Sequence, residues 1–411
     1  MAVIKPFAAV RPAAAFASSV AALPYDVYNR EEAREAVKGK PLSFLNIDRA
    51  ETQFSPDVDI YADFVYEKAA SLIKERIADG TFIRDEKPCF YIYALTMDGR
   101  TQTGLVCCSS IDDYQHGVIR RHENTRADKE KDRIRHVDVC NAQTGPIFLT
   151  YRQDVVIKYL IEVQKKKEPV YDFVSDDGIA HKVWIIEDTS AISAIEAAFL
   201  STPATYIADG HHRAASAVKV GLKRREENPG YTGKEEFNYF LSVLFPDNEL
   251  KILPYNRVVK DLNGLSKTGF LEKVSACFTV TDKGSVPYLP KEKATFGMYL
   301  EGSWYELRAK KEICPDDPVD GLDVSILQNS LLSPILGIED PKVDKRIDFV
   351  GGIRGLGELE RRVSEDMKVA FSMYPTSIGE LLSVADAGLL MPPKSTWFEP
   401  KLRSGLFLHM I

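Results

Sequence analysis

The chain has 411 residues, of which 45% are hydrophobic and 27% charged, and its formal net charge is −7. This composition is typical of a globular protein, and the length predicts two or more domains. The acidic balance excludes a general attraction to nucleic acid or to an anionic membrane, so we expect neither as a partner. The start of the chain lacks the apolar stretch of a signal peptide, and no run of apolar residues is long enough to span a bilayer. The six cysteines form no CxxC pair, and the sequence therefore predicts a cytoplasmic protein with free thiols.

The first hundred residues predict strands, helices and one hairpin. A strand interrupted by a proline is expected at residues 3–10, and a second strand at 43–47. A helical spacing of apolar residues predicts a helix over 60–78. Two alternating segments within 89–108, joined at Asp98-Gly99, predict a β-hairpin.

The middle of the chain continues with alternating helices and strands. A charged segment at 117–126 leads into a helix that reaches about His136, and Asp154 is placed to cap a helix over 155–166. Further elements are expected as a strand at 147–151, a helix at 190–200, a strand at 205–209 and a long helix ending near Glu227.

The texture of the sequence changes beyond Asp261 to a helix followed by strands that begin at Cys277 and at Thr295. A helix is expected there over 324–335. We therefore predict a core over residues 1–260 and an appended α+β lobe over 261–411, whose last part from about 345 returns to the core.

The segment from Thr205 to Ala217 carries the strongest functional signal. An apolar strand ends at Asp209, Gly210 allows a tight turn, and His211, His212 and Arg213 open the next helix. The first turn of a helix offers unpaired N–H groups and the positive end of the helix dipole, which attract anions. With an arginine fork and two imidazoles added, the segment predicts a phosphate site. The alternative is an ordinary helix start with polar residues facing solvent.

The charged segment at residues 117–126 is a second candidate for an anion-binding site. Arg120, Arg121, Arg126 and His122 form an anion-binding surface, with Thr125 among them. Glu123 is expected to stay ionised in that setting, which suits a magnesium or hydroxyl ligand. A solvated charge run is the alternative.

Two further residues complete the candidate set. Asp26 follows Pro24 on a restricted loop and is placed to act as a general base toward an alcohol, although a turn-forming aspartate is the commoner use. Lys394 follows two prolines and is placed to reach a phosphate, unless it belongs to an exposed turn. Asp209 and Glu123 are the candidate magnesium ligands. No HxxxH pattern supports a zinc site, whereas magnesium carried by a nucleotide needs only one or two carboxylates.

Five ordered motifs are spread along the chain. They are Lys5-Pro6-Phe7, Pro24-Tyr25-Asp26-Val27, Arg121-His122-Glu123-Asn124-Thr125, Asp209-Gly210-His211-His212-Arg213 and Met391-Pro392-Pro393-Lys394-Ser395-Thr396. Together they resemble the bacterial domain-of-unknown-function family numbered 1015, over essentially the whole chain. The Asp209–Arg213 motif further resembles the nucleotide-binding motif of the ParB/sulfiredoxin fold, which includes free-serine kinases. The resemblance implies an α+β fold with a ParB/sulfiredoxin-like core, extra strands and helices, and an appended lobe.

The resemblance also implies roles. Residues Gly210 to Arg213 would hold the phosphates of ATP or ADP, and Asp209 would serve metal or substrate. Asp26 takes the place of an N-terminal acid that is a glutamate in the serine kinases, so Glu123 competes with it as the general base.

The implied activity is a magnesium-dependent phosphotransfer to the hydroxyl of a small metabolite, with free L-serine the first candidate and a homodimer compatible with it. The alternative is a nucleotide-gated regulatory protein, as ParB is. A sulfiredoxin-like repair enzyme would need a cysteine where His211 stands.

Overall fold

The computed structural model describes residues 1–125 and 127–411, so Arg126 of the expected anion-binding segment lies outside the described residues. These residues form two compact units. The first comprises Met1–Leu250 together with Pro400–Ile411, and the second comprises Lys251–Glu399. The core was expected to end near 260, but β14 (Tyr255–Val259) pairs with strands of the second unit. The return to the first unit begins at Pro400, much later than the expected 345.

A mixed sheet of nine strands forms the centre of the first unit, in the order β6-β11-β8-β12-β5-β4-β10-β9, with β1 beside β5. Neighbouring strands are antiparallel except for the parallel pairs β6–β11 and β8–β12. The hairpin predicted at Asp98-Gly99 is confirmed, with φ of 52° and 75° at its two turn residues. The sheet strands are β1 (Ile4–Lys5), β4 (Phe90–Met97), β5 (Arg100–Ser110), β6 (Ile119–Arg120), β8 (Ile147–Tyr151), β9 (Tyr171–Val174), β10 (Ala180–Ile186), β11 (Thr205–Asp209) and β12 (Tyr239–Pro246). Small ladders pair β2 (Val10–Pro12) with β3 (Phe82–Arg84), and β7 (Ala142–Gln143) with β21 (His409–Met410).

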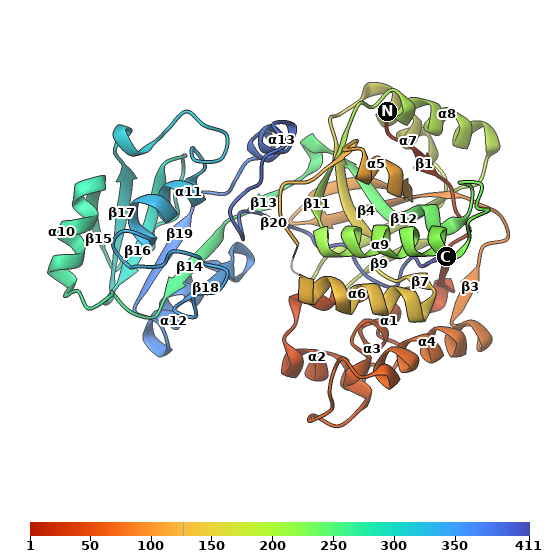
Figure 1. The fold of residues 1–411 in the computed structure, drawn as a ribbon, viewed down its shortest axis with the longest axis horizontal. Coiled ribbons are helices and arrows are strands. Elements are labelled where there is room, and N and C mark those ends of the chain that lie inside the picture. Colours follow the sequence, from red (N-terminus) through yellow and green to blue (C-terminus); the bar gives the residue numbers. More distant parts are fainter. Residues whose placement is uncertain (126) are drawn as a thin grey trace. The chain divides into compact units, whose positions relative to one another are not determined.

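Helices cover the sheet of the first unit on one face, where alternate strand residues such as Phe90, Ile92 and Leu105 pack with α5, α7, α8 and α9. Figure 1 shows α9 along the sheet with α6 beside it and α4 beyond. On the other face Tyr91 and Tyr93 contact Phe407 of the C-terminal segment. The helices are α1 (Ala17–Val20), α2 (Arg30–Val37), α3 (Leu45–Asp48), α4 (Asp63–Ala78), α5 (Ile111–Gln115), α6 (Ala127–Cys140), α7 (Val155–Gln164), α8 (Thr189–Leu200) and α9 (His211–Glu227).

The prediction of a strand at residues 43–47 is wrong, because the short helix α3 (Leu45–Asp48) forms there. Phe44, Leu45 and Ile47 all pack into one cluster with the N-terminal helices. The Asn46 side chain donates to the carbonyls of Lys40 and Pro41, which holds the preceding turn. A short apolar run does not distinguish a buried strand from a buried helix by its spacing.

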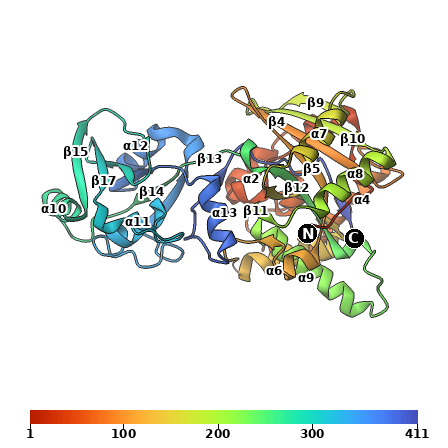
Figure 2. The ribbon, with the colours of Figure 1, turned by 90° about the horizontal axis from the view of Figure 1, so that it is seen from above.

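The second unit has an antiparallel sheet of six strands in the order β15-β17-β16-β19-β14-β18. Figure 2 shows helix α12 next to this sheet. Leu359 of α12 packs in one buried cluster with Trp304 of β17. The helix predicted over 324–335 is shorter in the structure. Helix α11 (Asp323–Leu327) ends at Leu327, and a short π-helical segment follows at Gln328–Leu332. Its remaining elements are β15 (Phe278–Gly284), β16 (Thr295–Leu300), β17 (Ser303–Ala309), β18 (Ile347–Gly351), β19 (Val369–Met373), the ladder of β13 (Ile252–Leu253) with β20 (Trp397–Phe398), and helices α10 (Lys267–Cys277), α11 (Asp323–Leu327), α12 (Gly355–Glu365) and α13 (Ile378–Asp386). No helix in the described parts of the chain has the length and apolarity needed to cross a bilayer.

Candidate functional site

Two strands of the first unit bring the two charged motifs together. The short strand β6 runs parallel to β11, with Ile119 opposite Thr205 and Arg120 opposite Tyr206. Parallel neighbours end at the same edge of a sheet, so the segments that follow them leave side by side. His122 and Glu123 consequently lie beside the turn at Asp209.

The turn itself has the geometry that the sequence predicts. Gly210 has φ 91° and ψ 32°, a left-handed conformation that glycine adopts without a Cβ penalty. No side chain among the described residues caps helix α9, and its first internal bond runs from Ala214 N to the Gly210 carbonyl at 2.9 Å. The N–H groups of His211 and Arg213 precede the helical hydrogen bonds, and such groups at a helix start can bind an anionic ligand.

Arg213 lies back over the turn and meets Asp209. Its Nη1 donates to the Pro146 carbonyl at 2.6 Å, and its Nη2 lies 3.5 Å from Asp209 Oδ2. The Nζ atom of Lys401 lies 3.4 Å from the same carboxylate oxygen. Burial would raise the pKa of Asp209, but the charges of Lys401 and Arg213 outweigh it and hold the pKa well below its usual range. Asp209 is thus an ionised carboxylate whose charge two cations offset.

Two buried histidines complete the site. The rings of His122 and His211 meet edge to face with centroids 4.5 Å apart, and they are 1% and 5% exposed. Glu123 Oε2 lies 3.9 Å from Nδ1 of His211. Burial lowers the pKa of His122 to about 4, although nearby Asp209 opposes the shift. Burial and the neighbouring His122 lower the pKa of His211 well below its usual value. Both imidazoles are therefore neutral at pH 7.

Several buried polar atoms of these side chains lack a partner within the described chain. Nε2 of His211 and Nε of Arg213 form no hydrogen bond. Neither ring nitrogen of His122 forms one of normal geometry, although the Ile207 backbone lies near its ring. Buried polar groups are satisfied in the great majority of proteins, so a cluster of unsatisfied ones at an uncapped helix start marks a ligand site. The donors and the arginine fit an anionic oxygen group such as a phosphate. We call this set the α9 site, and it comprises Asp209, Gly210, His211 and Arg213 with His122, Glu123 and Lys401.

Asp26 belongs to the surroundings of this site. It is exposed on the short 3-10 turn Tyr25–Val27. Burial lowers the pKa of Arg213, but the charges of Asp26 and Asp209 outweigh it and raise the pKa above its usual value. Tyr25 of the same turn is half-buried, and its ring centroid lies 4.0 Å from the Arg133 guanidinium carbon.

The other predicted residues have local roles. Arg121 is exposed and donates to the Tyr114 hydroxyl at 3.4 Å. Thr125 donates to Glu130. His212 is half-buried at the second position of α9. Lys394 belongs to the second unit, where its Nζ lies 5.6 Å from the centroid of the Tyr255 ring. A phosphate contact by any of these four stays a prediction.

The sequence did not single out Lys401. This residue follows Pro400 in a short C-terminal stretch of alternating basic and apolar residues, and its side chain is 11% exposed. The sequence feature that could have identified Lys401 is its place in a stretch where basic residues alternate with leucines. Nothing in the sequence connects it with Asp209, which precedes it by 192 residues.

Metal ligation was predicted for Asp209 and Glu123. Among residues 1–125 and 127–411, no group of three or more His, Cys, Asp or Glu side chains has an arrangement suited to a metal ion. The two carboxylates alone would supply a partial shell, of the kind that magnesium completes with phosphate oxygens and water.

Solved structures give weak similarities. They include a conserved hypothetical protein from Pyrococcus furiosus (14% identity, TM-score 0.36, covering 74% of this chain and 94% of that one). A free serine kinase in complex with AMP matches at 13% identity and TM-score 0.35, covering 74% and 91%. SbnI from Staphylococcus aureus, truncated at its C-terminus, matches at 11% identity and TM-score 0.40, covering 74% and 87%. These scores are too low to establish a common fold.

No curated protein matches the chain. The family model described as "Protein of unknown function (DUF1015)" matches residues 4–325. Four of the five sequence motifs lie within the matched residues, and the motif at residues 391–396 lies beyond them. The chain belongs to this family, as its sequence motifs predict.

Proposed function

We propose that the protein is a nucleotide- and magnesium-dependent phosphotransferase that acts on the hydroxyl of a small metabolite, with free L-serine as the first candidate acceptor. ATP and ADP are both compatible donors. A cytoplasmic location and a homodimer belong to the same proposal.

The observation that carries the proposal is the set of unsatisfied buried atoms at the uncapped start of α9. Nε2 of His211 and Nε of Arg213 have no hydrogen-bond partner in the described chain, and both residues belong to the first turn of α9. Phosphoryl transfer requires chiefly positioning and charge neutralisation, which a helix start, an arginine and neutral donors supply.

The residues divide into three roles. Gly210, His211 and Arg213 would hold the phosphate oxygens, and the nucleotide would supply the phosphoryl group. Asp209 and Glu123 would complete the magnesium shell. Lys401 keeps Asp209 ionised, because its ammonium group lies 3.4 Å from the carboxylate.

The proton of the acceptor hydroxyl needs a base, and two carboxylates compete for this role. Asp26 is exposed and near enough to Arg213 to raise its pKa. Oε2 of Glu123 lies 3.9 Å from Nδ1 of His211, the first residue of α9. Asp26→Asn and Glu123→Gln separate the two, because loss of the base reduces kcat while the affinity for the nucleotide measured without magnesium is retained.

Calorimetry with ATP and ADP, followed by phosphorus NMR with magnesium, L-serine and a panel of amino acids and polyols, tests the proposal. We expect saturable nucleotide binding and a new phosphomonoester signal with one acceptor. Absence of both would refute it. Nucleotide binding without transfer to any acceptor would instead support the alternative of a nucleotide-gated regulatory protein, which gel shift with duplex DNA would then examine.

A further inference from the structure

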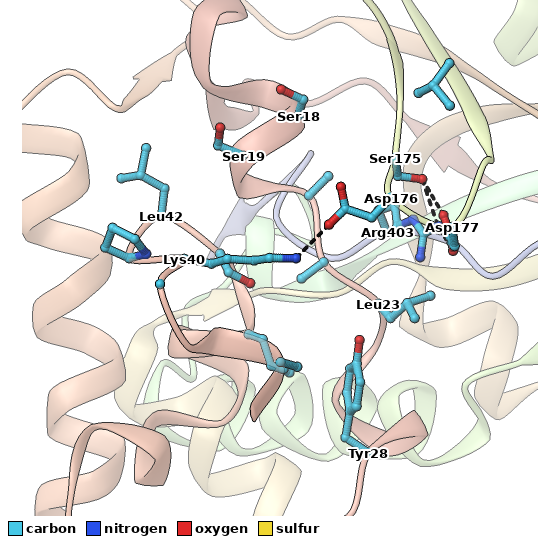
Figure 3. A pocket seen from close by; sticks show the side chains of 18 residues that line it. Ser18, Ser19, Leu23, Tyr28, Lys40, Leu42, Ser175, Asp176, Asp177 and Arg403 are labelled. Atoms are coloured by element: carbon cyan, nitrogen blue, oxygen red, sulfur yellow. Dashed lines mark hydrogen bonds and ion pairs between the residues drawn. The ribbon is translucent and has the colours of Figure 1, made fainter. Parts of the chain in front are cut away.

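The first unit contains a cavity of about 620 Å³ that shares no lining residue with the α9 site. Its walls come from α1, from the segment around Lys40 and from the turn between β9 and β10, as Figure 3 shows. Ligand sites in proteins commonly have volumes of about 300–1,000 Å³. The cavity therefore has the size of a small-molecule site.

One wall of this cavity carries a rigidly held arginine. Nη2 of Arg403 donates to Ser175 Oγ at 3.1 Å and to Asp177, and its Nε lies 3.4 Å from Nε2 of His181. His181 is fully buried, and its Nδ1 lies 2.9 Å from the Tyr93 hydroxyl. The Arg403 side chain is only 4% exposed. Its Nη1 forms no hydrogen bond within the described residues, so this group remains for a ligand.

The opposite wall contributes a second cation. Nζ of Lys40 reaches across to Asp176 Oδ2 at 2.6 Å (Figure 3). These two side chains are 56% and 90% exposed, and such exposed ion pairs contribute little stability. A ligand charge can therefore replace either partner at small cost.

The charges around the cavity balance. Lys40 and Arg403 are positive, and Asp176 and Asp177 are negative. A purely anionic ligand would face the two carboxylates, and a purely cationic one would face the two cations. A zwitterion satisfies both sets, because each of its charges finds an opposite partner.

The remaining lining favours a ligand with an apolar portion. Leu23 and Leu42 lie on the cavity wall together with Tyr28 (Figure 3). The hydroxyls of Ser18 and Ser19 on α1 form no hydrogen bond to any described residue, and they supply further polar contacts. Apolar walls with a few polar groups are typical of sites that bind small organic molecules.

We propose that this cavity binds a free α-amino acid with an apolar side chain, in its zwitterionic form. The carboxylate would contact Nη1 of Arg403 and the ammonium group of Lys40. The amino group would contact Asp176, and the side chain would pack against the leucines. This site is distinct from that of the proposed phosphotransfer, so its test does not depend on that activity.

The first experiment is saturation-transfer NMR and calorimetry of the full chain with L-leucine, L-methionine and L-phenylalanine. The tightest binder is then compared with its amide, which lacks the carboxylate, and with its deaminated acid, which lacks the ammonium group. We expect both analogues to bind at least tenfold more weakly. Absence of saturable binding for all three amino acids, or equal binding of an analogue, would overturn the proposal.

The second experiment places the ligand in the cavity. Lys40→Ala and Asp176→Ala change exposed side chains, so the fold should persist, and each should weaken binding at least fivefold. Lys182→Ala is the matched control, because Lys182 forms an exposed ion pair with Asp172 at 2.9 Å in the same hairpin but does not line the cavity. Equal affinity in all three variants would place the ligand elsewhere and overturn the proposal.

Discussion

Replacement of Arg213 by alanine gives the most direct test of the α9 site. The guanidinium group of Arg213 carries a positive charge at the start of α9, and its Nε has no hydrogen-bond partner in the described chain. Loss of one hydrogen bond to a charged group costs about 1.5–3 kcal/mol. Because about 1.4 kcal/mol corresponds to a tenfold change in Kd, the affinity for ATP should fall by about 10- to 150-fold. Adenosine lacks phosphates, so its affinity should change little.

The same variant has a structural cost that must be measured separately. Arg213 also donates to the Pro146 carbonyl and offsets the charge of Asp209. An unsatisfied buried acceptor costs about 1–3 kcal/mol, so thermal unfolding should show reduced stability. Arg224→Ala is the matched control, because Arg224 lies near the other end of α9 and pairs with Asp138. A folded Arg213→Ala protein that binds ATP as tightly as this control would refute the phosphate role of the site.

Four further outcomes are expected. Gly210→Ala should destabilise the protein by about 1–2 kcal/mol and weaken ATP binding, because φ is 91° and the new Cβ would lie 3.1 Å from the Arg213 guanidinium. Chemical denaturation measures the stability and calorimetry the ATP affinity. Gly230→Ala is the control, because a Cβ at Gly230 meets no atom of the described residues within 4 Å. Burial and the charge of Arg403 lower the pKa of His181 from 6.5 to about 3, so between these pH values only the unfolded state binds this proton. The free energy of unfolding should therefore fall as the pH drops from about 6.5 toward 3. His181→Gln should make chemical denaturation less dependent on pH in this window. Burial raises the pKa of Asp323 from 3.8 to about 7, so its ionisation should reduce the stability of the second unit as the pH rises between these values. Asp323→Asn should remove this loss of stability when the melting temperatures at pH 5 and pH 8 are compared. Replacement of residues 252–398 by a short glycine-serine linker should leave the first unit folded, because Glu399 N donates to Lys251 O at 3.2 Å and the two ends already lie together. Absence of a cooperative thermal unfolding transition would contradict this.

Local chemistry made much of the secondary structure predictable. Asp154 caps α7 by accepting from Val156 and Ile157, and Asn29 forms a capping box at α2. These features depend on residues within four positions of one another, so the sequence displays them directly. The division of the chain was harder to predict, because β14 looks like any other strand until its partners in the second sheet are known.

The α9 site shows the same limit. The turn at Gly210 was predictable because strand, glycine and helix start lie within a few residues. The approach of His122 to His211 was not, since it depends on the parallel pairing of β6, a strand of two residues. Lys401 reaches Asp209 only because the last residues of the chain return to the first unit.

Burial also changes how the histidines of the α9 site should act. A cluster of histidine and arginine in sequence suggests a cationic surface, but burial lowers the pKa of His122 to about 4 and holds the pKa of His211 well below its usual value. The positive charge of the site therefore rests on Arg213 and Lys401, and part of it is already offset by Asp209. A neutral imidazole still donates one N–H, so the two rings can orient a phosphate oxygen without adding net charge. This division keeps the charge of the site constant around neutral pH, and it leaves the metal carried by the nucleotide to neutralise the remaining phosphate charge.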